Sequence, residues 1–372
     1  MSDSTPARAA GNTRGTLAVL VCLLGVSLWL GGRHTPSPFA AVGNAPSAPL
    51  PLWAAPASAS LLLRVGVADR GPSVERMAAQ AFRDVLLSLE KGRIYPSVVD
   101  ATVWGRPQAG DVELVRAVIA GDPPLAVVGS AALANSCPSL DVLEVSYLFQ
   151  DDEHVDRILR GPTGRGLLDS LEARGLQGLA FVGEAFRVLA ASRPLPRPTD
   201  LAGYRVGTVE NAVGGLFVSA LGAEAVPAPR GRLREMVRSG FVDAADTDLT
   251  LLQNVRLGTI LPYVLETHHA VSARVLIANS RFMRELPTPH RISVWRAVLG
   301  ATAAARREVL RASEKARRMA LAQNRLRTLT PHETQSLRTS VNRAMSLALS
   351  SMDPRIVHEI TLARPLSRAI KR

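Results

Sequence analysis

From residue 61 onward the sequence alternates between short apolar runs and longer segments with helical periodicity. Residues 61–67 form an apolar run typical of a buried strand, and residues 74–89 carry apolar side chains at helical spacing. Residues 97–103 predict a further strand, and residues 111–119 predict a helix with Asp111 as its cap. A chain with this alternation buries its strands in a sheet and covers them with helices, so we expect an α/β fold with a largely parallel sheet.

The same alternation continues to the end of the chain. The next predicted elements are a strand at 125–128, a helix ending near Leu159, a helix over 164–174 stopped by Gly175, separate strands at 178–182 and 186–191, a strand at 204–208, and a helix starting at Gly214. Residues 293–327 form one Ala/Arg-rich helical pattern with few breakers. This pattern is too long for a simple crossover between two strands, so we expect the helix to lie across two lobes.

The first sixty residues differ from the rest. Arg8 and Arg14 precede an apolar run over residues 16–32, which is followed by a stretch rich in Pro, Ala and Ser. The run is about 17 residues, long for a signal core and just long enough to span a bilayer. We therefore predict export to the periplasm, with residues 1–33 as a signal peptide or a retained inner-membrane anchor and residues 34–60 as a linker.

Charge and cysteine content limit the classes of function. The formal net charge is +12, but only Lys91, Lys315 and Lys371 are lysines, and the arginines are scattered among acidic residues along the chain. Without a nucleic-acid-binding motif, this pattern indicates a composition bias, and we expect no nucleic-acid partner. Cys22 lies inside the apolar run and leaves Cys137 alone in the remainder, so no intramolecular disulfide is expected after export.

Motifs of catalysis and metal binding are missing from the sequence. It contains no G-x-S-x-G or C-x-x-C motif. The adjacent His268 and His269 point apart on a helix or strand, so we expect one buried and one solvated histidine instead of a metal site. The glycine-rich residues 161–166 lack the Walker lysine and predict a helix-start turn, and the acidic residues 151–153 predict a helix N-terminus. We expect neither an enzyme nor a bound cofactor.

Several segments in the middle of the chain occur in a characteristic order. They are Ser146 to His154 (Ser-Tyr-Leu-Phe-Gln-Asp-Asp-Glu-His), Phe186-Arg187, Pro198 to Gly203 (Pro-Thr-Asp-Leu-Ala-Gly), Leu221-Gly222-Ala223, and Gly240 to Asp243 (Gly-Phe-Val-Asp). In these residues the chain resembles the DctP-type solute-binding proteins of tripartite ATP-independent periplasmic (TRAP) transporters. The run from Pro198 to Gly203 is the strongest single signal.

The resemblance implies a two-lobed, periplasmic-binding-protein-like fold of type II character, with the long helix bridging the lobes. Lobe I is expected to comprise residues 61–183 with 273–312, and lobe II residues 184–272 with 313–372. The lobes are expected to close on a small solute and to deliver it to the membrane permease subunits of a TRAP transporter. Most members of the family bind organic carboxylates, which arginine satisfies with two parallel charge-assisted hydrogen bonds.

The resemblance also implies ligand-binding positions, and this chain departs from some of them. The ligand arginine of the family corresponds to Gly207, and Arg205 stands where the family has a lysine, so only a β-bulge would bring Arg205 to the ligand face. A second family arginine is matched by Arg187. A pocket aromatic corresponds to Arg230, and a polar asparagine corresponds to Thr247.

Two explanations of these departures remain open. In one, Arg187 and Arg230 clamp an anion, and Thr247 and Asn211 add hydrogen bonds. In the other, the pocket has diverged and binds a different solute or none. A buried arginine without an anion is costly, so burial of either arginine would favour the clamp.

The expected function is that of a periplasmic solute-binding subunit that captures a small anionic organic solute, such as a carboxylate, by lobe closure. The alternative is a membrane-tethered ligand-sensing or interaction protein on the same fold with a diverged pocket.

Overall fold

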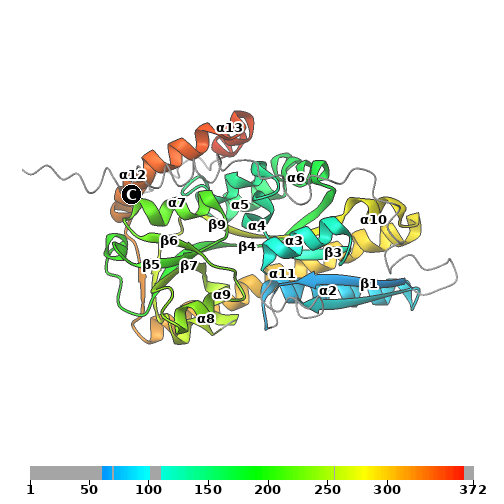
Figure 1. Ribbon diagram of the computed structural model, residues 1–372, viewed down its shortest axis with the longest axis horizontal. Helices are drawn as coiled ribbons and strands as arrows, with labels where there is room; N and C mark the ends of the chain where they lie inside the picture. The colour runs from blue at the N-terminus through cyan, green and yellow to red at the C-terminus, as the bar shows by residue number, and fades with distance from the viewer. Residues whose placement is uncertain (1–60, 69–70, 101–109, 255, 364–372) are drawn as a thin grey trace, which may run out of the picture. The chain divides into compact units, whose positions relative to one another are not determined.

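The computed structural model describes residues 61–68, 71–100, 110–254 and 256–363 (Figure 1). The predicted signal peptide or anchor and the predicted linker, residues 1–60, lie outside this range. Of the helices in the described part, none is both long enough and apolar enough to cross a bilayer.

The chain begins with three parallel strands and two helices in the predicted order. Strand β1 (Leu61–Val67) lies between β2 (Ile94–Asp100) and β3 (Leu125–Gly129) and is parallel to both. Helix α2 (Val74–Glu90) connects β1 to β2, and α3 (Asp111–Ala120) precedes β3. Because the apolar residues of α2 repeat at helical spacing, one side of the helix is buried against this part of the sheet.

Two local predictions in this region were wrong. The strand predicted at residues 97–103 begins earlier, at Ile94, which is fully buried and pairs with Leu61, so pairing with β1 sets its start; residues 101–103 lie outside the described residues. Asp111 is the first residue of α3, and the cap is Gly110. The carboxylate of Asp111 instead accepts a 2.9 Å hydrogen bond from the backbone N–H of Gly129, at the end of β3.

A single long strand replaces the two strands predicted at residues 178–182 and 186–191. Strand β4 (Leu176–Ala191) pairs antiparallel with β9 (Val271–Asn279) through Phe186, with two irregularities in register near Gly178 and Phe181. Its last five residues, Arg187 to Ala191, pair antiparallel with β7 (Ala244–Asp248). Strand β4 therefore belongs to both halves of the sheet, and it carries Arg187 to the point where they meet.

The second half of the sheet is built around β7. Strand β5 (Arg205–Thr208) is parallel to β7 and to β6 (Glu224–Pro227). Strand β8 (Tyr263–Glu266) is antiparallel to β4 and parallel to β10 (Leu326–Thr328). The strand order is β2-β1-β3-β9-β4-β7-β5-β6, and the antiparallel pairs at β4 and β9 make the sheet mixed, whereas the sequence predicted a largely parallel one.

Short helices lie between the strands, before α11 and at the end of the described part of the chain. They are α4 (Ser130–Ala134), α5 (Asp152–Leu159), α6 (Pro162–Asp169), α7 (Ala212–Ala220), α8 (Leu233–Arg238), α9 (Leu249–Asn254), α10 (Ser280–Glu285) and α13 (Pro354–Leu362), with 3₁₀ turns at Pro138–Glu144, Ser170–Arg174, Pro198–Leu201 and Leu257–Thr259. The acidic run caps α5 through Asp151, and Gly161 starts α6, both as predicted. Gly175 ends the following turn with a φ of 75°, which glycine adopts without strain.

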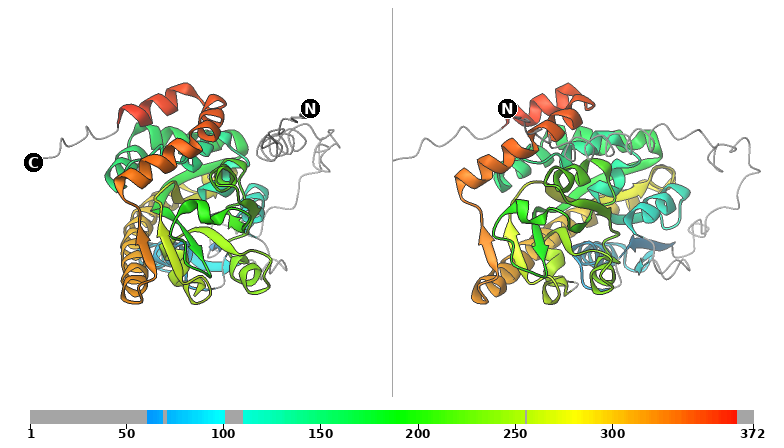
Figure 2. Two further views of the ribbon diagram at one scale, coloured as in Figure 1. Left: turned by 90° about the vertical axis from the view of Figure 1, so that its left-hand side faces the viewer. Right: turned by 60° about the vertical axis from the view of Figure 1, so that its left-hand side comes forward.

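The predicted long helix is α11 (Thr288–Ala322), followed by α12 (Pro331–Ser350). It starts and ends about five residues earlier than the sequence pattern suggested, because Pro289 occupies its first turn and Asn324 leaves the helix with a φ of 56°. Helix α11 packs against α2, β4 and α9, so it contacts both halves of the sheet. The two-lobed fold with a bridging helix is therefore confirmed. Figure 2 shows α12 and α13, in orange and red, on the same side as α7.

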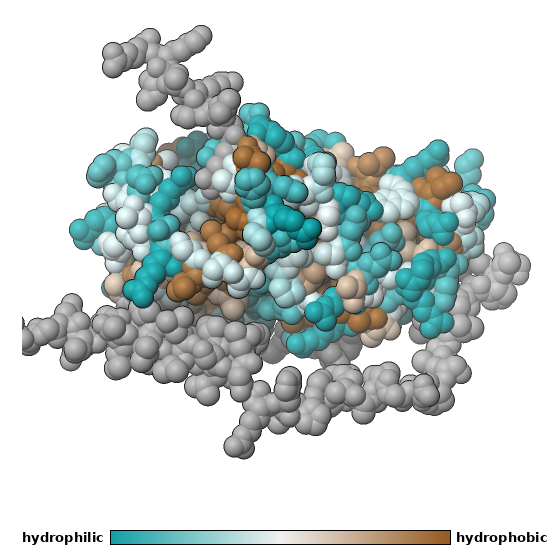
Figure 3. All heavy atoms as spheres, turned by 90° about the horizontal axis from the view of Figure 1, so that it is seen from above, coloured by the Kyte–Doolittle hydropathy of each residue, from teal (hydrophilic) through white to brown (hydrophobic). Residues whose placement is uncertain are grey.

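Within the described part of the chain, the core consists of three apolar clusters. One lies between the α2–α11 pair and strands β1, β3 and β9, and a smaller one lies under α8 and α9. The largest covers the opposite face, from α3 through α5 and α7 to α12. In the surface view of Figure 3, apolar residues form small patches separated by polar ones.

Candidate functional site

A pocket of about 570 Å³, including its open mouth, lies where the two halves of the sheet meet. Strand β4 supplies Arg187, and β7 supplies the run Asp246-Thr247-Asp248 beside it, because Arg187 pairs with Asp248 in the register of the two strands. The N-terminus of α3 and the loops after β5 and β6 complete the wall. The charged side chains on the wall are Asp111, Arg187, Glu210, Arg230, Asp246 and Asp248.

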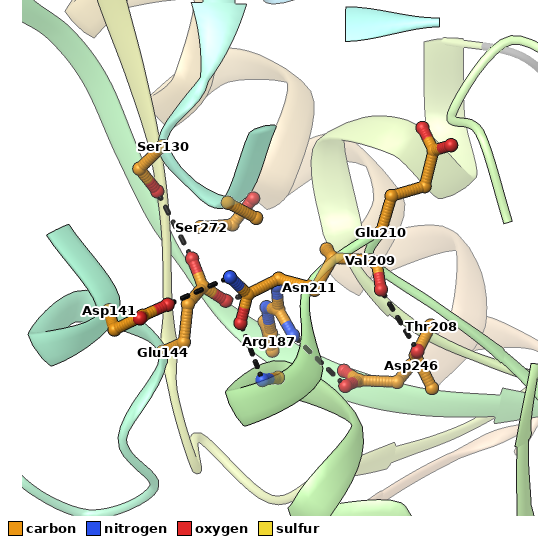
Figure 4. Close-up of polar contacts among 12 residues, drawn as sticks. Ser130, Asp141, Glu144, Arg187, Thr208, Val209, Glu210, Asn211, Asp246 and Ser272 are labelled. Carbon is orange, nitrogen blue, oxygen red and sulfur yellow. Dashed lines mark hydrogen bonds and ion pairs between the residues drawn. The ribbon is translucent and has the colours of Figure 1, made fainter. Parts of the chain in front are cut away.

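Arg187 is held between two carboxylates, as Figure 4 shows. Its guanidinium donates to Glu144 at 2.7 Å and to Asp246 at 3.1 Å, and only 2% of its surface is exposed. Burial lowers the pKa of Arg187, but Glu144 and Asp246 outweigh that effect and raise it overall. The charge of this buried arginine is thus compensated within the protein. Its burial alone does not require an anionic ligand, contrary to the expectation from the sequence.

Asp246 also faces a buried histidine. Its second oxygen lies 3.3 Å from Nε2 of His269, and the ring of Phe217 stacks on that histidine at 3.7 Å. Burial opposes the ionisation of Asp246, but Arg187 and His269 outweigh it and lower the pKa of this carboxyl. Burial lowers the pKa of His269, which favours the neutral ring. Since His268 is exposed, the prediction of one buried and one solvated histidine is confirmed.

A second set of charges lies behind Asp248. Arg274 donates to Asp248 at 2.7 Å and to Glu75 at 3.1 Å, and Nη1 of Arg230 lies 3.6 Å from each of the same two carboxylates. Burial opposes the ionisation of Asp248, but Arg274 and Arg230 outweigh it and hold its pKa well below the usual range. Arg230 is 13% exposed and forms part of the pocket wall, so it is a cation at the surface of the pocket.

The pocket wall also carries acidic residues from both halves of the fold, Asp111 at the start of α3 and Glu210 after β5. Burial raises the pKa of Asp111, which accepts a hydrogen bond from the N–H of Gly129. Burial, followed by repulsion from Glu113 and Asp111, raises the pKa of Glu210 to about 7. In Figure 4 the side chain of Glu210 extends away from Arg187. Asp111 and Glu210 therefore offer carboxyl groups that can accept hydrogen bonds, or donate them when protonated.

The structure brings three of the five predicted ligand-binding residues together. Arg187, Arg230 and Thr247 line the pocket. Thr247 is 6% exposed, and its hydroxyl has no hydrogen-bond partner among the described residues. A buried hydroxyl without a partner costs free energy, so Thr247 has hydrogen-bonding capacity left for a ligand.

Arg205 and Asn211 do not line the pocket. Arg205 pairs with Asp243 at 3.2 Å and donates to the backbone oxygen of Gly240, and its side chain is 42% exposed. Asn211 caps α7 by accepting a 3.0 Å hydrogen bond from the N–H of Gly214, and it donates to Asp141 at 2.8 Å. Both residues have structural partners, and Asn211 acts on the site only by fixing the start of α7.

Gly207, where the resemblance places the ligand arginine of the family, is closely packed. A Cβ atom on Gly207 would lie 2.6 Å from Cδ1 of Leu233. Strand β5 pairs with β6 in continuous register from Arg205 to Thr208, so no bulge turns Arg205 toward the pocket. The local packing therefore leaves little room for a side chain at Gly207 and keeps Arg205 away from the pocket.

Sequence reasoning missed the partners that hold the pocket arginines. Glu144 is 43 residues from Arg187, and Glu75 is 199 residues from Arg274, so no local motif could have connected them. Asp246 and Asp248 lie next to Thr247 on the same strand. This position in the sequence was the one signal that could have identified them as partners of the arginines. Within the described part of the chain, no group of three or more His, Cys, Asp or Glu residues is arranged to hold a metal ion.

Comparison with known proteins adds an independent result. The family model described as bacterial extracellular solute-binding protein, family 7, matches residues 73–349. The 2,3-diketo-L-gulonate-binding periplasmic protein of Escherichia coli is 26% identical over 58% of this chain and 65% of its own length.

Two solved structures share the fold. The sugar acid binding protein of Advenella mimigardefordensis, in complex with galactonate, superimposes with a TM-score of 0.77 at 22% identity, over 82% of this chain and 97% of that one. A TRAP periplasmic solute-binding protein of Shewanella oneidensis with bound succinate has a TM-score of 0.77 at 18% identity, over 82% of this chain and all of that one.

Proposed function

The chain belongs to family 7 of the bacterial extracellular solute-binding proteins, and from this premise we propose that it captures a small organic carboxylate in the pocket beside Arg187 and Arg230. The observation that supports the proposal most directly is the wall itself, which carries the guanidinium of Arg230 and the hydroxyl of Thr247, and this hydroxyl has no hydrogen-bond partner among the described residues. A carboxylate can accept from both groups at once. The proposed role is binding, without a chemical step.

The carboxyl groups on the pocket wall narrow the class of solute that we propose. Beside the two arginines the wall carries the carboxyl groups of Asp111, Glu210, Asp246 and Asp248, to which a solute made only of anionic groups offers no hydrogen-bond donor. Hydroxyl groups donate hydrogen bonds to carboxylates. A solute with a carboxylate and several hydroxyls can therefore accept hydrogen bonds from the arginines and donate them to the acidic residues of the wall. The Advenella protein with galactonate is similar in fold, which is consistent with this choice.

Capture is proposed to occur by closure of the two lobes around the solute. Arg187 and Thr247 lie on strands of one half of the sheet, whereas Asp111 starts a helix of the other half, so one solute touches both. Contacts that form only in the closed state shift the equilibrium toward it. We propose a periplasmic location, export through the N-terminal segment, and delivery to TRAP permease subunits.

Calorimetric titration of the full-length chain tests the proposal, with galactonate, succinate and neutral galactitol as probes. We expect galactonate to bind and galactitol not to bind. Arg230→Met should weaken galactonate binding about 10- to 100-fold, because a hydrogen bond to a charged group contributes about 1.5–3 kcal/mol. Thr247→Val should weaken it about fivefold, as expected for a neutral hydrogen bond of about 1 kcal/mol.

The matched control is Arg238→Met, which removes an exposed arginine from α8 without touching the pocket and should leave the affinity unchanged. If neither acid binds, or if Arg230→Met and Arg238→Met behave alike, carboxylate capture at this pocket is wrong. The membrane-tethered interaction protein would then be the better description.

A further inference from the structure

A second cavity lies outside the pocket described above, between α12 and the segment that joins the 3₁₀ turn Pro138–Glu144 to α5. It holds about 540 Å³ of free space, including its open mouth. Its polar lining comes from Ser146, Arg338, Asn342 and Ser346, and its aromatic lining comes from Tyr147. No acidic residue is present among the described residues that line it, in contrast to the first pocket.

Arg338 is the only charged residue on the described wall of this cavity. Its guanidinium carbon lies 5.0 Å from the centroid of the Tyr147 ring, a cation–π arrangement that orients the side chain. Its Nε atom is buried and has no hydrogen-bond partner among the described residues. Among the described residues no carboxylate forms an ion pair with Arg338, whereas Arg187 and Arg230 of the first pocket each lie within ion-pair distance of protein carboxylates.

Ser146 provides a second donor on the same wall. It is 6% exposed, and its hydroxyl has no hydrogen-bond partner in the described part of the chain. Its backbone N–H lies 3.2 Å from the sulfur of Met345 on α12, so the segment is held close to the helix. Ser146 and Arg338 therefore place a hydroxyl and a guanidinium in the wall of one cavity, and together they can serve an acceptor with more than one lone pair.

The backbone at Tyr147 is strained in a way that keeps this geometry. Its φ of 63° is unusual for a bulky residue. The conformation is maintained by hydrogen bonds from its backbone N–H to the oxygen of His269 and from its hydroxyl to the oxygen of Thr267. The ring of Tyr147 is thereby fixed as one wall of the cavity, beneath the guanidinium of Arg338.

The rest of the wall is apolar. Val145, Leu148, Val341, Met345 and Leu349 contribute aliphatic surface. From these residues together with Arg338 and Ser146, we propose that this cavity is a second ligand site, one that binds a small carboxylate with an apolar body. The carboxylate accepts from Arg338 and Ser146, and the apolar body lies against the side chains of α12 and the ring of Tyr147.

Titration of the full-length chain with hexanoate, hexylamine and hexan-1-ol tests this site. Hexanoate is expected to bind, and the amine and the alcohol at least tenfold more weakly. Arg338→Met should weaken hexanoate binding at least tenfold, and Ser146→Ala should weaken it severalfold. Arg343→Met, an exposed arginine on the same helix outside the cavity, should have no effect.

Two further variants separate this site from the first pocket and from a loss of folding. Hexanoate binding should persist in Arg230→Met, which alters only the first pocket. Ser346→Trp places a large ring at the exposed mouth of the cavity and should abolish hexanoate binding while the far-ultraviolet circular dichroism stays that of the parent. Binding that is lost in Arg230→Met but kept in Arg338→Met would overturn the proposal, as would equal binding of hexanoate and hexylamine or no binding of hexanoate.

Discussion

At the scale of single residues, the centre of this protein is a set of buried charges that compensate one another. Arg187 lies between Glu144 and Asp246, and Arg274 lies between Glu75 and Asp248. Each guanidinium joins segments that are far apart in the chain. Removal of one such cation leaves carboxylates buried and unpaired, which costs more than the net value of the pair.

We therefore expect Arg187→Met to lower the free energy of unfolding by about 3–5 kcal/mol at pH 7, measured by urea denaturation. The loss should shrink toward pH 5. Without Arg187, burial raises the pKa values of Glu144 and Asp246 in the folded state, and a carboxyl with a raised folded pKa destabilises the fold only once the pH exceeds its unfolded value. At low pH both groups are neutral in either state.

Arg205→Met is the control for that variant. It removes an arginine that is 42% exposed and paired with Asp243 at 3.2 Å, and an exposed ion pair contributes about 0–1 kcal/mol. Equal losses for Arg187→Met and Arg205→Met would contradict the assignment of Arg187 to a buried, fully paired position.

The sequence could identify some residues of the pocket and not others. Arg187 and Thr247 were found because they lie in segments that resemble the family, and both line the pocket. The carboxylates that neutralise the arginines were not found, because their proximity depends on the pairing of β4 with β7 and on the packing of the 3₁₀ turn at Glu144. Charge compensation of this kind is a property of the tertiary structure.

At the scale of elements, the contact between α2 and α11 sets how the long helix lies on the sheet. Gly300 allows a close approach, because a Cβ atom there would lie 2.6 Å from Cγ2 of Val85. Valine has one strongly preferred rotamer in a helix, so it cannot easily move away. The glycine is therefore explained by packing, although it lowers the intrinsic helix propensity of α11.

Gly300→Ala should accordingly destabilise the protein by about 1–3 kcal/mol, because overpacking outweighs the gain of about 1 kcal/mol in helix propensity. In the double variant Gly300→Ala/Val85→Ala the clash is gone, and stability should exceed that of Val85→Ala alone. Urea unfolding of the four proteins of this cycle gives the coupling energy. Additive effects would show that the two helices do not meet at these residues.

The order of the elements was predictable, but several boundaries were not. The apolar periodicity of residues 74–89 and of the α11 segment identified both helices, since their buried faces repeat at helical spacing. The division of β4 into two strands failed because Gly183 and Glu184 interrupt the apolar run, whereas both lie within a strand that soon passes from one half of the sheet to the other. Pairing with β9 keeps that stretch extended.

At the scale of the whole molecule, the approach of the two sides of the pocket brings like charges together. Glu210 follows β5 in one half of the fold, and Asp111 and Glu113 lie in the first turn of α3 in the other half. Their mutual repulsion adds to burial in raising the pKa of Glu210 to about 7. This shift depends on the two halves lying against each other, so titration of Glu210 reports on that arrangement.

The difference in melting temperature between Glu210→Gln and the parent protein should therefore depend on pH. Because the folded pKa of about 7 lies above the ordinary glutamate value of 4.5, the folded parent holds a proton that the unfolded chain releases, and its stability falls as the pH rises from about 4.5 to about 7. Glutamine carries no such proton, so the variant should gain stability relative to the parent over this range and no further above it. The gain should be modest, since Glu210 is partly exposed to solvent.

The same measurement on Glu113→Gln separates repulsion across the pocket from burial alone. Removal of the Glu113 charge should lower the pKa of Glu210 and move the end of the pH-dependent range downward, because Glu113 is the largest charge contribution to the shift. If Glu210→Gln differs from the parent by a constant amount between pH 5 and pH 8, Glu210 does not face α3 in solution. The two halves of the fold would then be separated in the absence of solute. A solute with hydroxyl donors for these carboxylates would be needed to bring the two halves together.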